Sequence, residues 1–228
     1  MIMGGAMNST IDFKNNDDLA FFGKVNASIS HELKNILAII SEAAGLLQDL
    51  TDIAAKGQKI ELEMLTTCSQ DIVEEIQRGF ATIKQMNTFS HSMDEPVKEV
   101  NLADIVDLMI ALSKFLSFAC TVRFDPLPEG AAVVSTCPFR LQNLIYQALI
   151  FAFESTGPDG QIRVAIHPQP NGGAHITFSG CGSNNAGTFA SDKTKKIAAS
   201  IGVDIREAFN LQGFELIVPE NAEAVPQH

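Results

Sequence analysis

The sequence predicts an α+β protein, in which an antiparallel helical hairpin that dimerises into a four-helix bundle is followed by an α/β sandwich. Two observations support this prediction. Apolar residues recur every three or four positions, without proline, over two long stretches before residue 93. After Val100 the pattern changes to short β-rich pieces, separated by glycine-containing turns and shorter helical stretches.

The first predicted helix begins near Phe22 and ends near Ala54. Its apolar seam is expected at Phe22, Val25, Ile29, Leu33, Ile36, Ile40, Ala43, Leu47, Leu50 and Ala54. A reversal through residues 54–57 leads to a second helix that ends near His91. The seam of this helix is expected at Leu65, Cys68, Ile72, Ile76, Gly79, Ile83 and Met86.

Each helix carries a further apolar row that two helices alone cannot cover. The row comprises Ile39 and Leu46 on the first helix and Val73 and Phe80 on the second. Pairing two hairpins into a four-helix bundle would bury it. We therefore expect a homodimer.

The expected domain organisation has five parts. These are an N-terminal arm (1–18), the dimerising helical hairpin (19–93), a polar linker (94–101), the α/β sandwich (102–219) and a tail (220–228). Within the sandwich we expect helices at 102–119, 140–154 and 193–201, and strands at 121–125, 131–135, 161–167, 174–178, 203–209 and 213–218. The residues from 219 onward are expected to be disordered.

Composition excludes several classes of protein. The 228 residues are 46% hydrophobic and 19% charged, which is typical of a folded globular chain. The net charge of −11 would repel phosphate backbones and anionic lipid surfaces, so nucleic acid is not expected as a partner. The longest apolar window, 105–122, carries Asp107 and Lys114, so no transmembrane helix and no membrane partner are predicted.

The cell compartment and the redox state follow from the N-terminus and the cysteines. Residues 1–24 lack the features of an export signal, so a cytoplasmic location is expected. The four cysteines form no CxxC pair and are interpreted as buried, reduced thiols. They are Cys68, Cys120, Cys137 and Cys181.

The first helix carries a candidate reactive group at His31, Glu32 and Asn35. His31 lies two residues from each of Ile29 and Leu33, so it should point about 160° away from the buried stripe, toward solvent. Asn35 lies one turn later on that face, with Lys34 beside it, and Glu32 can reach the other imidazole nitrogen and fix its tautomer. A neutral ring nitrogen can attack phosphorus while the carboxylate holds the ring and takes its proton, and the amide orients a phosphoryl oxygen or a water.

Spacing alone does not single out this chemistry, because an exposed histidine followed by glutamate is common on polar helix faces. The stretch 22–47, with S-H-E-L-K-N at 30–35, resembles the H-box of bacterial sensor histidine kinases, S-H-E-L-[KR]-[NT]-P-L. In that family the motif heads the dimerisation and phosphotransfer helix. Ile36 stands in place of the usual proline, which should leave a straighter helix without removing a reacting group. The resemblance thus implies that His31, Glu32 and Asn35 take part in phosphoryl transfer.

The second half resembles the family's ATP-binding α/β sandwich in the order, spacing and length of its elements, but its nucleotide-binding residues differ. In the helix matching L-x-Q-V-L-x-N-L-L-x-N-A, Gln147 and Phe151 replace the two asparagines, the second of which binds magnesium. Phe178 replaces the aspartate that contacts the adenine amino group in V-x-D-x-G-x-G. A phenyl ring cannot accept a hydrogen bond, and a charge-assisted one is worth about 1.5–3 kcal/mol.

The family's ATP lid and second glycine-rich motif are also missing, since only residues 183–192 separate Gly182 from Lys193. We interpret Ser179–Gly187 as an ordinary turn, and Phe151 and Phe178 as core residues that fill the former nucleotide pocket. The chain is therefore expected to bind no cofactor. His167, His175 and Cys181 lack ligand spacing, so no metal site is assigned.

The resemblance implies a histidine phosphotransferase of a bacterial two-component phosphorelay, similar to dimeric transfer proteins that look like histidine kinases stripped of ATP binding. His31 would exchange a phosphoryl group with the aspartate of a response-regulator receiver domain, which supplies its own Mg²⁺. The receiver is expected to dock on the exposed face formed by Ala27, Lys34, Asn35, Ala38 and Glu42. Three alternatives remain open: a receiver phosphatase in which Asn35 positions a water, a pseudokinase adaptor that binds a response regulator or a kinase, and an active autokinase.

Overall fold

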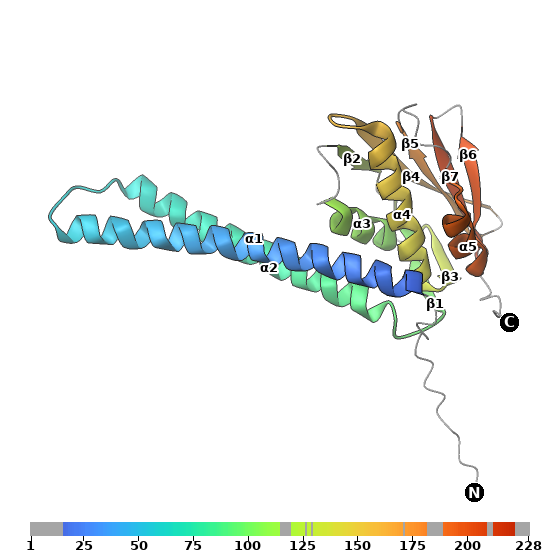
Figure 1. Cartoon of the computed structure of the whole chain (residues 1–228), viewed down its shortest axis with the longest axis horizontal. Coiled ribbons are helices and arrows are strands. Elements are labelled where there is room, and N and C mark those ends of the chain that lie inside the picture. Colours follow the sequence, from blue (N-terminus) through green and yellow to red (C-terminus); the bar gives the residue numbers. More distant parts are fainter. Residues whose placement is uncertain are drawn as a thin grey trace, which may run out of the picture. The chain divides into compact units, whose positions relative to one another are not determined.

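A computed structural model of the chain describes residues 16–114, 120–125, 127–128, 130–170, 172–181, 189–208 and 212–221. These residues form two compact units (Figure 1). Residues 22–88 make up a helical unit. The second unit combines the start of the first helix, through Phe21, with the chain from Phe89 onward.

The helical unit is the predicted antiparallel hairpin of α1 (Asn16–Ala55) and α2 (Leu62–His91). Gly57, with a φ of +77°, closes α1 by donating its backbone N–H to the carbonyl of Ala54 over 2.9 Å. The two helices approach closely at Gly79, where an added Cβ would lie 3.7 Å from Ile36. A larger residue at Gly79 would press on that contact.

The seam of the hairpin matches the prediction only in part. The predicted residues that are buried are Val25, Ile29, Ile36, Ala43, Leu50 and Cys68, whereas Phe22, Leu33, Ile40 and Leu47 are half-buried and Ala54 is exposed. The predictions for Ile76 and Ile83 are wrong, since these side chains are 43% and 41% exposed. Glu75 and Thr82 take their places, because the seam of α2 alternates strictly by three and four residues from Leu65 to Phe89. Glu32 similarly occupies the α1 seam ahead of Leu33.

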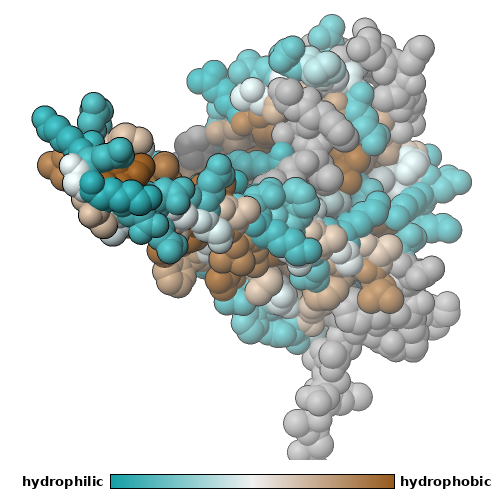
Figure 2. Space-filling view, turned by 60° about the vertical axis from the view of Figure 1, so that its left-hand side comes forward, coloured by the Kyte–Doolittle hydropathy of each residue, from teal (hydrophilic) through white to brown (hydrophobic). Residues whose placement is uncertain are grey.

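The additional apolar row is exposed, as the sequence indicates. Ile39, Leu46, Val73 and Phe80 are all exposed, and Ile76 and Ile83 extend the row on α2. Hydrophobic surface is visible among the polar side chains of the hairpin in Figure 2. Such a row on a helix pair is typical of a surface that another protein chain covers.

The second unit is built on a five-stranded sheet in the order β2-β4-β5-β7-β6. Its strands are β2 (Thr121–Phe124), β4 (Gln161–Pro168), β5 (Ala174–Ser179), β6 (Asp204–Ala208) and β7 (Gly213–Val218). β2 runs parallel to β4, and the other pairs are antiparallel. The predicted antiparallel pairing of residues 161–167 with 174–178 is confirmed, and Val164, Phe178 and Phe214 lie in register across the centre of the sheet.

Three helices accompany the sheet: α3 (Leu102–Ser113), α4 (Pro138–Thr156) and α5 (Asp192–Ser200) (Figure 1). Every second residue is buried along β4 from Ile162 to Ile166, along β5 from Ala174 to Phe178 and along β7, as expected for strands with one face against a core. The helix predicted at 102–119 corresponds to α3, which ends at Ser113. Residues 115–119 lie outside the described ranges. The chain is thus an α+β protein with N-terminal helices followed by an α/β sheet unit.

The predicted linker and tail both contain ordered pairing. The last four residues of the linker form β1 (Lys98–Asn101), which pairs with β3 (Val133–Thr136) because Val100 lies opposite the buried Val134. Asn101 then caps α3 by accepting the N–H of Ala103 over 3.0 Å. At the other end, the Ser135 N–H donates to the Glu220 carbonyl over 2.8 Å. The prediction of disorder is therefore wrong for residues 219–221, and residues 222–228 lie outside the described ranges.

The boundaries of the compact units differ from the predicted domain boundaries because of an aromatic cluster. Phe21, near the start of α1, lies 5.3 Å from Phe139 and 5.2 Å from Tyr146 between ring centroids, and 5.5 Å from Phe89 at the end of α2. These rings attach both helix ends to the α/β unit. Residues 16–18 of the predicted arm belong to α1, and residues 1–15 lie outside the described ranges.

All four cysteines are buried and free, as predicted. Burial raises the pKa of the Cys181 thiol from about 9 to about 11, and it also raises the pKa of Cys137 and of Tyr146. No helix among the described residues has both the length and the apolar character that crossing a bilayer requires.

The raised pKa of Cys181 predicts a loss of stability in alkali. A thiol that ionises at about pH 9 unfolded and about pH 11 folded contributes fully below pH 9, and its contribution disappears as the pH rises through 11. A pKa difference of about two between the unfolded and the folded thiol corresponds to about 2.7 kcal/mol. The free energy of unfolding should therefore fall by about 2–3 kcal/mol between pH 8 and pH 11. Urea unfolding from pH 8 to pH 11 measures it. In Cys181→Ala the fall should be smaller by that amount, and an equal fall in both proteins would contradict the assignment.

Candidate functional site

The predicted reactive histidine lies on the exposed face of α1, where the sequence places it. His31 and Asn35 are both exposed, one helical turn apart. The amide nitrogen of Asn35 lies 3.3 Å from Nδ1 of His31. The imidazole is therefore open to solvent and is held by the amide of its own helix.

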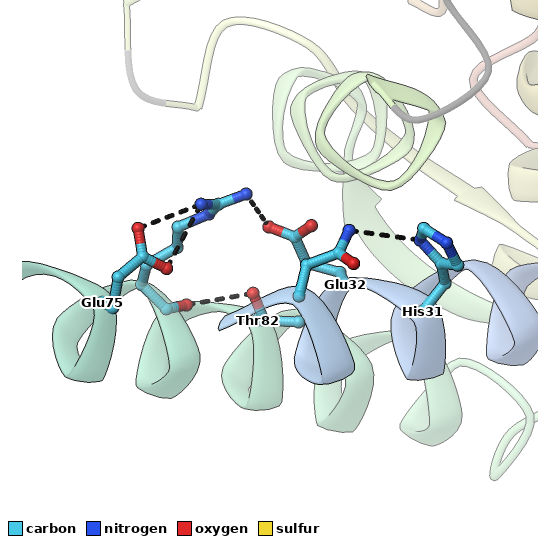
Figure 3. Close-up of polar contacts among 6 residues, drawn as sticks. His31, Glu32, Glu75 and Thr82 are labelled. Atoms are coloured by element: carbon cyan, nitrogen blue, oxygen red, sulfur yellow. Dashed lines mark hydrogen bonds and ion pairs between the residues drawn. The ribbon is translucent and has the colours of Figure 1, made fainter. Parts of the chain in front are cut away.

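Glu32 does not hold the imidazole, contrary to the prediction. Its side chain is only 5% exposed, and Oε1 pairs with Nη2 of Arg78 on α2. The other oxygen, Oε2, is buried without a hydrogen-bond partner among the described residues. The physical reason is the position of Glu32 in the hairpin seam, where its side chain is directed toward the partner helix. Figure 3 shows the Glu32 carboxylate joined to a guanidinium group on α2. A separate dashed line joins the His31 ring to an amide group.

Arg78 connects two carboxylates. Nη1 lies 3.1 Å from Oε1 and 3.3 Å from Oε2 of Glu75, one turn earlier on α2. The carboxylates of Glu75 and Glu32 raise the pKa of the Arg78 guanidinium, against the opposing effect of its burial. Thr82 donates its hydroxyl to the carbonyl of Arg78 over 3.0 Å.

Sequence reasoning missed this polar layer within the seam. Strict heptad spacing was the available signal, since it places Glu75 and Thr82 in register with Leu65, Cys68 and Ile72. Selecting the nearest apolar residue at each turn favoured Ile76 and Ile83 instead. The regular heptad spacing therefore locates the seam more accurately than the choice of the nearest apolar residue at each turn.

The contact with Asn35 specifies a tautomer of His31. With the amide placed as it is, its nitrogen can only donate, so Nδ1 accepts and the ring proton of the neutral form lies on Nε2. A nitrogen that bears a proton has no free lone pair to attack phosphorus. Attack from Nε2 thus requires the other tautomer, in which a nearby oxygen accepts from Nδ1–H.

The residues of the predicted receiver dock are accessible. Ala27, Lys34, Ala38 and Glu42 are exposed on α1 together with Asn35. Two alanines near His31 leave room for a partner to approach the helix backbone.

Phe151 and Phe178 lie in an aromatic cluster with Phe189 and Phe214. Phe178 is fully buried and stacks on Phe214, with centroids 4.9 Å apart and planes 9° apart. Phe214 stacks on Phe189 at 4.4 Å, and Phe151, which is half-buried, lies 5.5 Å from Phe214. The prediction that these two residues pack in the core is confirmed for Phe178 and, in part, for Phe151.

Two polar side chains of α4, Gln147 and Asn143, are engaged with each other. Gln147, at the first asparagine position of the family helix, donates to Oδ1 of Asn143 over 3.3 Å, and Asn143 contacts Asp18 of α1 at 3.5 Å. Burial raises the pKa of the Asp18 carboxyl, an effect that Arg140 opposes. At the three positions matched to the family motifs, Phe151 and Phe178 carry phenyl rings, which offer no ligand to magnesium and no acceptor to an adenine amino group, and Gln147 is hydrogen-bonded to Asn143.

The turn after β5 has a structural explanation. Gly180 adopts a φ of +79°, and a Cβ there would lie 2.3 Å from the carbonyl oxygen of Gln161. Backbone geometry alone therefore requires this glycine. Residues 182–187 of the segment predicted as an ordinary turn lie outside the described ranges.

The histidines of the sheet have protein partners. His167 lies 3.3 Å from the hydroxyl of Thr177, and His175 lies 3.4 Å from a carboxylate oxygen of Glu215. Within the described part of the chain, no group of three histidine, cysteine, aspartate or glutamate side chains is arranged to hold a metal ion.

No family model matches the sequence, and no curated protein shows significant sequence similarity to it. Among solved structures, the chain is similar to the catalytic domain of the histidine kinase ThkA in a nucleotide-free form (TM-score 0.46, 16% identity, 56% of this chain and 99% of that one). It is also similar to the Acinetobacter baumannii histidine kinase AdeS (TM-score 0.43, 9% identity, 78% and 95%). A third is ThkA in complex with the response regulator protein TrrA (TM-score 0.41, 18% identity, 91% and 64%). At these values the likeness concerns the fold and assigns no role to a residue.

Proposed function

We propose that the chain is a histidine phosphotransferase of a two-component phosphorelay. It carries a phosphoryl group on His31, exchanges it with the aspartate of a response-regulator receiver domain, and does not use ATP. The observation that supports this most directly is the exposed imidazole of His31 with the Asn35 amide 3.3 Å from Nδ1, within a sequence that resembles the H-box. The aromatic cluster at Phe151 and Phe178 supports a source of phosphate other than bound nucleotide.

The transfer step balances without a cofactor held by this chain. Nε2 of the neutral Nδ1–H tautomer attacks the phosphorus of the receiver's aspartyl phosphate in line. The N–P bond forms as the P–O bond breaks, and the aspartate carboxylate leaves with the electron pair. The ring becomes a phosphorylated imidazolium that keeps its proton on Nδ1, so a hydrogen-bond acceptor at Nδ1 stabilises the product. Reversal of these bonds returns the group to a receiver.

The proposal includes a homodimer and a docking face. The exposed row on α2 gives two hairpins a surface on which to form the four-helix bundle. The receiver would lie over Ala27, Lys34, Asn35, Ala38 and Glu42 and bring the Mg²⁺ that its phosphoaspartate requires.

Label transfer tests the proposal. A panel of receiver domains carrying radioactive phosphate is mixed with the chain, and acid-labile, alkali-stable label is measured on it. We expect label on the wild type and none above background on His31→Ala, because no other side chain reproduces the exposed imidazole on α1. His91→Ala is the matched control, since His91 is also exposed but lies at the end of α2 beside Asp94, and its label should equal that of the wild type.

Three outcomes would overturn the proposal. Equal label on His31→Ala would assign another acceptor, and no label from any receiver would remove the transfer role. Label from ATP alone would identify an autokinase.

The position of Asn35 also permits a second function. Its amide lies beside His31 on the exposed face, where it could orient a water toward a docked aspartyl phosphate. In that case the receiver would lose phosphate without labelled His31, and Asn35→Ala would stop the loss. A pseudokinase adaptor would bind the receiver with equal affinity in the wild type and in His31→Ala.

A further inference from the structure

The carboxylate next to the proposed phosphoacceptor is held away from it by an arginine of the other helix. Glu32 follows His31 directly in sequence, yet its Oε1 pairs with Arg78 of α2. The transfer step needs an acceptor at Nδ1 of His31, and the Asn35 amide nitrogen cannot serve, because it donates. In the structure, His31 therefore has the tautomer that cannot attack from Nε2, and the Glu32 carboxylate is not at Nδ1. This arrangement corresponds to a resting site.

The Glu32–Arg78 pair has the features of a contact that can open. Oε2 of Glu32 is buried without a partner among the described residues, so the carboxylate is incompletely satisfied where it lies. Arg78 also contacts both oxygens of Glu75, so it would keep a counter-charge after losing Glu32. Its side chain is 45% exposed, which gives the guanidinium access to water.

Release would bring Glu32 within reach of the imidazole by a change of rotamer. Adjacent residues lie 100° apart around a helix, so a side chain as long as glutamate can be directed from the seam toward the exposed face. Leaving the seam also returns a charged group to water, which offsets part of the lost ion pair. The cost of releasing Glu32 is therefore smaller than the loss of the ion pair alone would suggest.

We propose that Arg78 is a positioning residue that stores the Glu32 carboxylate in the hairpin seam, and that release of Glu32 to Nδ1 of His31 converts the imidazole to the tautomer that transfers phosphate. This inference rests on the proposed function. In the conversion, Nε2 loses a proton to water and Nδ1 gains one, which Glu32 then accepts as a hydrogen bond. Glu75 also takes part, because its carboxylate remains paired with Arg78 after Glu32 has moved to His31.

The ¹⁵N chemical shifts of the His31 ring measure the tautomer in the full chain, without any phosphotransfer. At a pH where the ring is neutral, we expect the wild type to show a protonated Nε2 and an unprotonated Nδ1. Arg78→Gln should reverse the pattern, because Glu32 is released. Glu32→Gln combined with Arg78→Gln should restore the wild-type pattern, and Arg78→Lys, which keeps a cation, should resemble the wild type.

Rates of label transfer provide the second measurement. Arg78→Gln should increase the initial rate of His31 phosphorylation by about a hundredfold, the lower end of the usual range for a positioned acid–base group. The same substitution should have no effect on the rate when Glu32 is already glutamine. Glu75→Gln should lower the rate, because Arg78 then has Glu32 as its main partner. This opposite sign keeps the test decisive if Arg78→Gln unfolds the hairpin.

The result that would overturn the inference is an unchanged tautomer in Arg78→Gln, or a rate gain that persists without the Glu32 carboxylate. A protonated Nδ1 in the wild type would also overturn it, since Asn35 would then accept through its oxygen. Failure of the proposed function is distinguishable, because it would remove label from the wild type and leave the tautomer measurements unaffected.

Discussion

Replacing Phe178 with aspartate, the residue that the resembling ATP-binding motif has at this position, is expected to unfold the α/β unit and not to create a nucleotide site. Phe178 is fully buried on the central strand of the five-stranded sheet. Its ring stacks on Phe214 at 4.9 Å. Removing a buried phenyl group costs about 3–5 kcal/mol, and a carboxylate without a partner adds a further penalty. The sum approaches the total stability of an ordinary domain, about 5–15 kcal/mol.

Thermal unfolding followed by near-ultraviolet circular dichroism measures the effect. Phe178→Leu is the matched control, because it keeps an apolar side chain and should cost only about 1–2 kcal/mol. Calorimetric titration with magnesium and ATP should give no heat of binding for the wild type or for Phe178→Leu. A folded Phe178→Asp protein with an unchanged unfolding midpoint would contradict the packing argument, and nucleotide binding by the wild type would contradict the proposed source of phosphate.

Phe151 and Phe178 show which part of a structure the sequence predicts at such positions and which part it does not. A phenylalanine in place of a hydrogen-bonding residue predicts that a ligand contact is lost, because the ring has no acceptor. The sequence does not tell which other rings complete the cluster. Phe189 lies shortly before α5 and Phe214 lies in β7, so their contact at 4.4 Å depends on how these two segments are arranged in the folded unit.

The hairpin illustrates a second limit. Helical periodicity predicted both helices and the exposure of His31, since the face of a residue depends only on its angle around the helix. It did not predict that Glu32 pairs with Arg78, because the phase of one helix against another is set by packing at sites such as Gly79 and Ile36. Adjacency in sequence suggested a Glu32–His31 contact, and the seam position of Glu32 overrode it. The tautomer of His31 was thus beyond sequence reasoning.

The strand at the end of the predicted linker and the ordered start of the tail have a common cause. Residues 98–101 and 219–221 have no strong local pattern of their own. Each is ordered by a segment distant in sequence, β3, through the Val100–Val134 pair and the Ser135–Glu220 hydrogen bond. Local composition predicts a linker or a disordered tail when the stabilising partner is not local.

Phe80→Glu is expected to convert the proposed dimer to a monomer. Phe80 is 69% exposed and lies in the middle of the row that includes Val73, Ile76 and Ile83. Residues 73, 76, 80 and 83 are spaced by three and four positions, so they form one continuous stripe along α2. A stripe of this kind gains stability from a second hydrophobic surface, and about 25 cal/mol is gained for each Å² of apolar area that is covered.

In a twofold dimer, a glutamate in the middle of this stripe is present in both protomers, so its destabilising effect on the interface occurs twice. Each protomer loses the burial of one phenyl ring, and each brings a carboxylate toward the same interface, where desolvation and like-charge repulsion both oppose association. Losses of about 3 kcal/mol or more raise the dimer dissociation constant by at least about a hundredfold. Sedimentation equilibrium over a range of protein concentrations measures that constant.

Ala81→Glu is the matched control for this substitution. Residue 81 is also exposed on α2, adds the same charge, and lies 100° around the helix from Phe80, outside the stripe. Its dissociation constant should remain within about threefold of the wild type, because surface charges away from the interface have small effects. Equal weakening by both variants would indicate that net charge, not the apolar stripe, controls association. A Phe80→Glu protein that dimerises like the wild type would show that two copies do not meet on this face, and the stripe would then be assigned to a different partner.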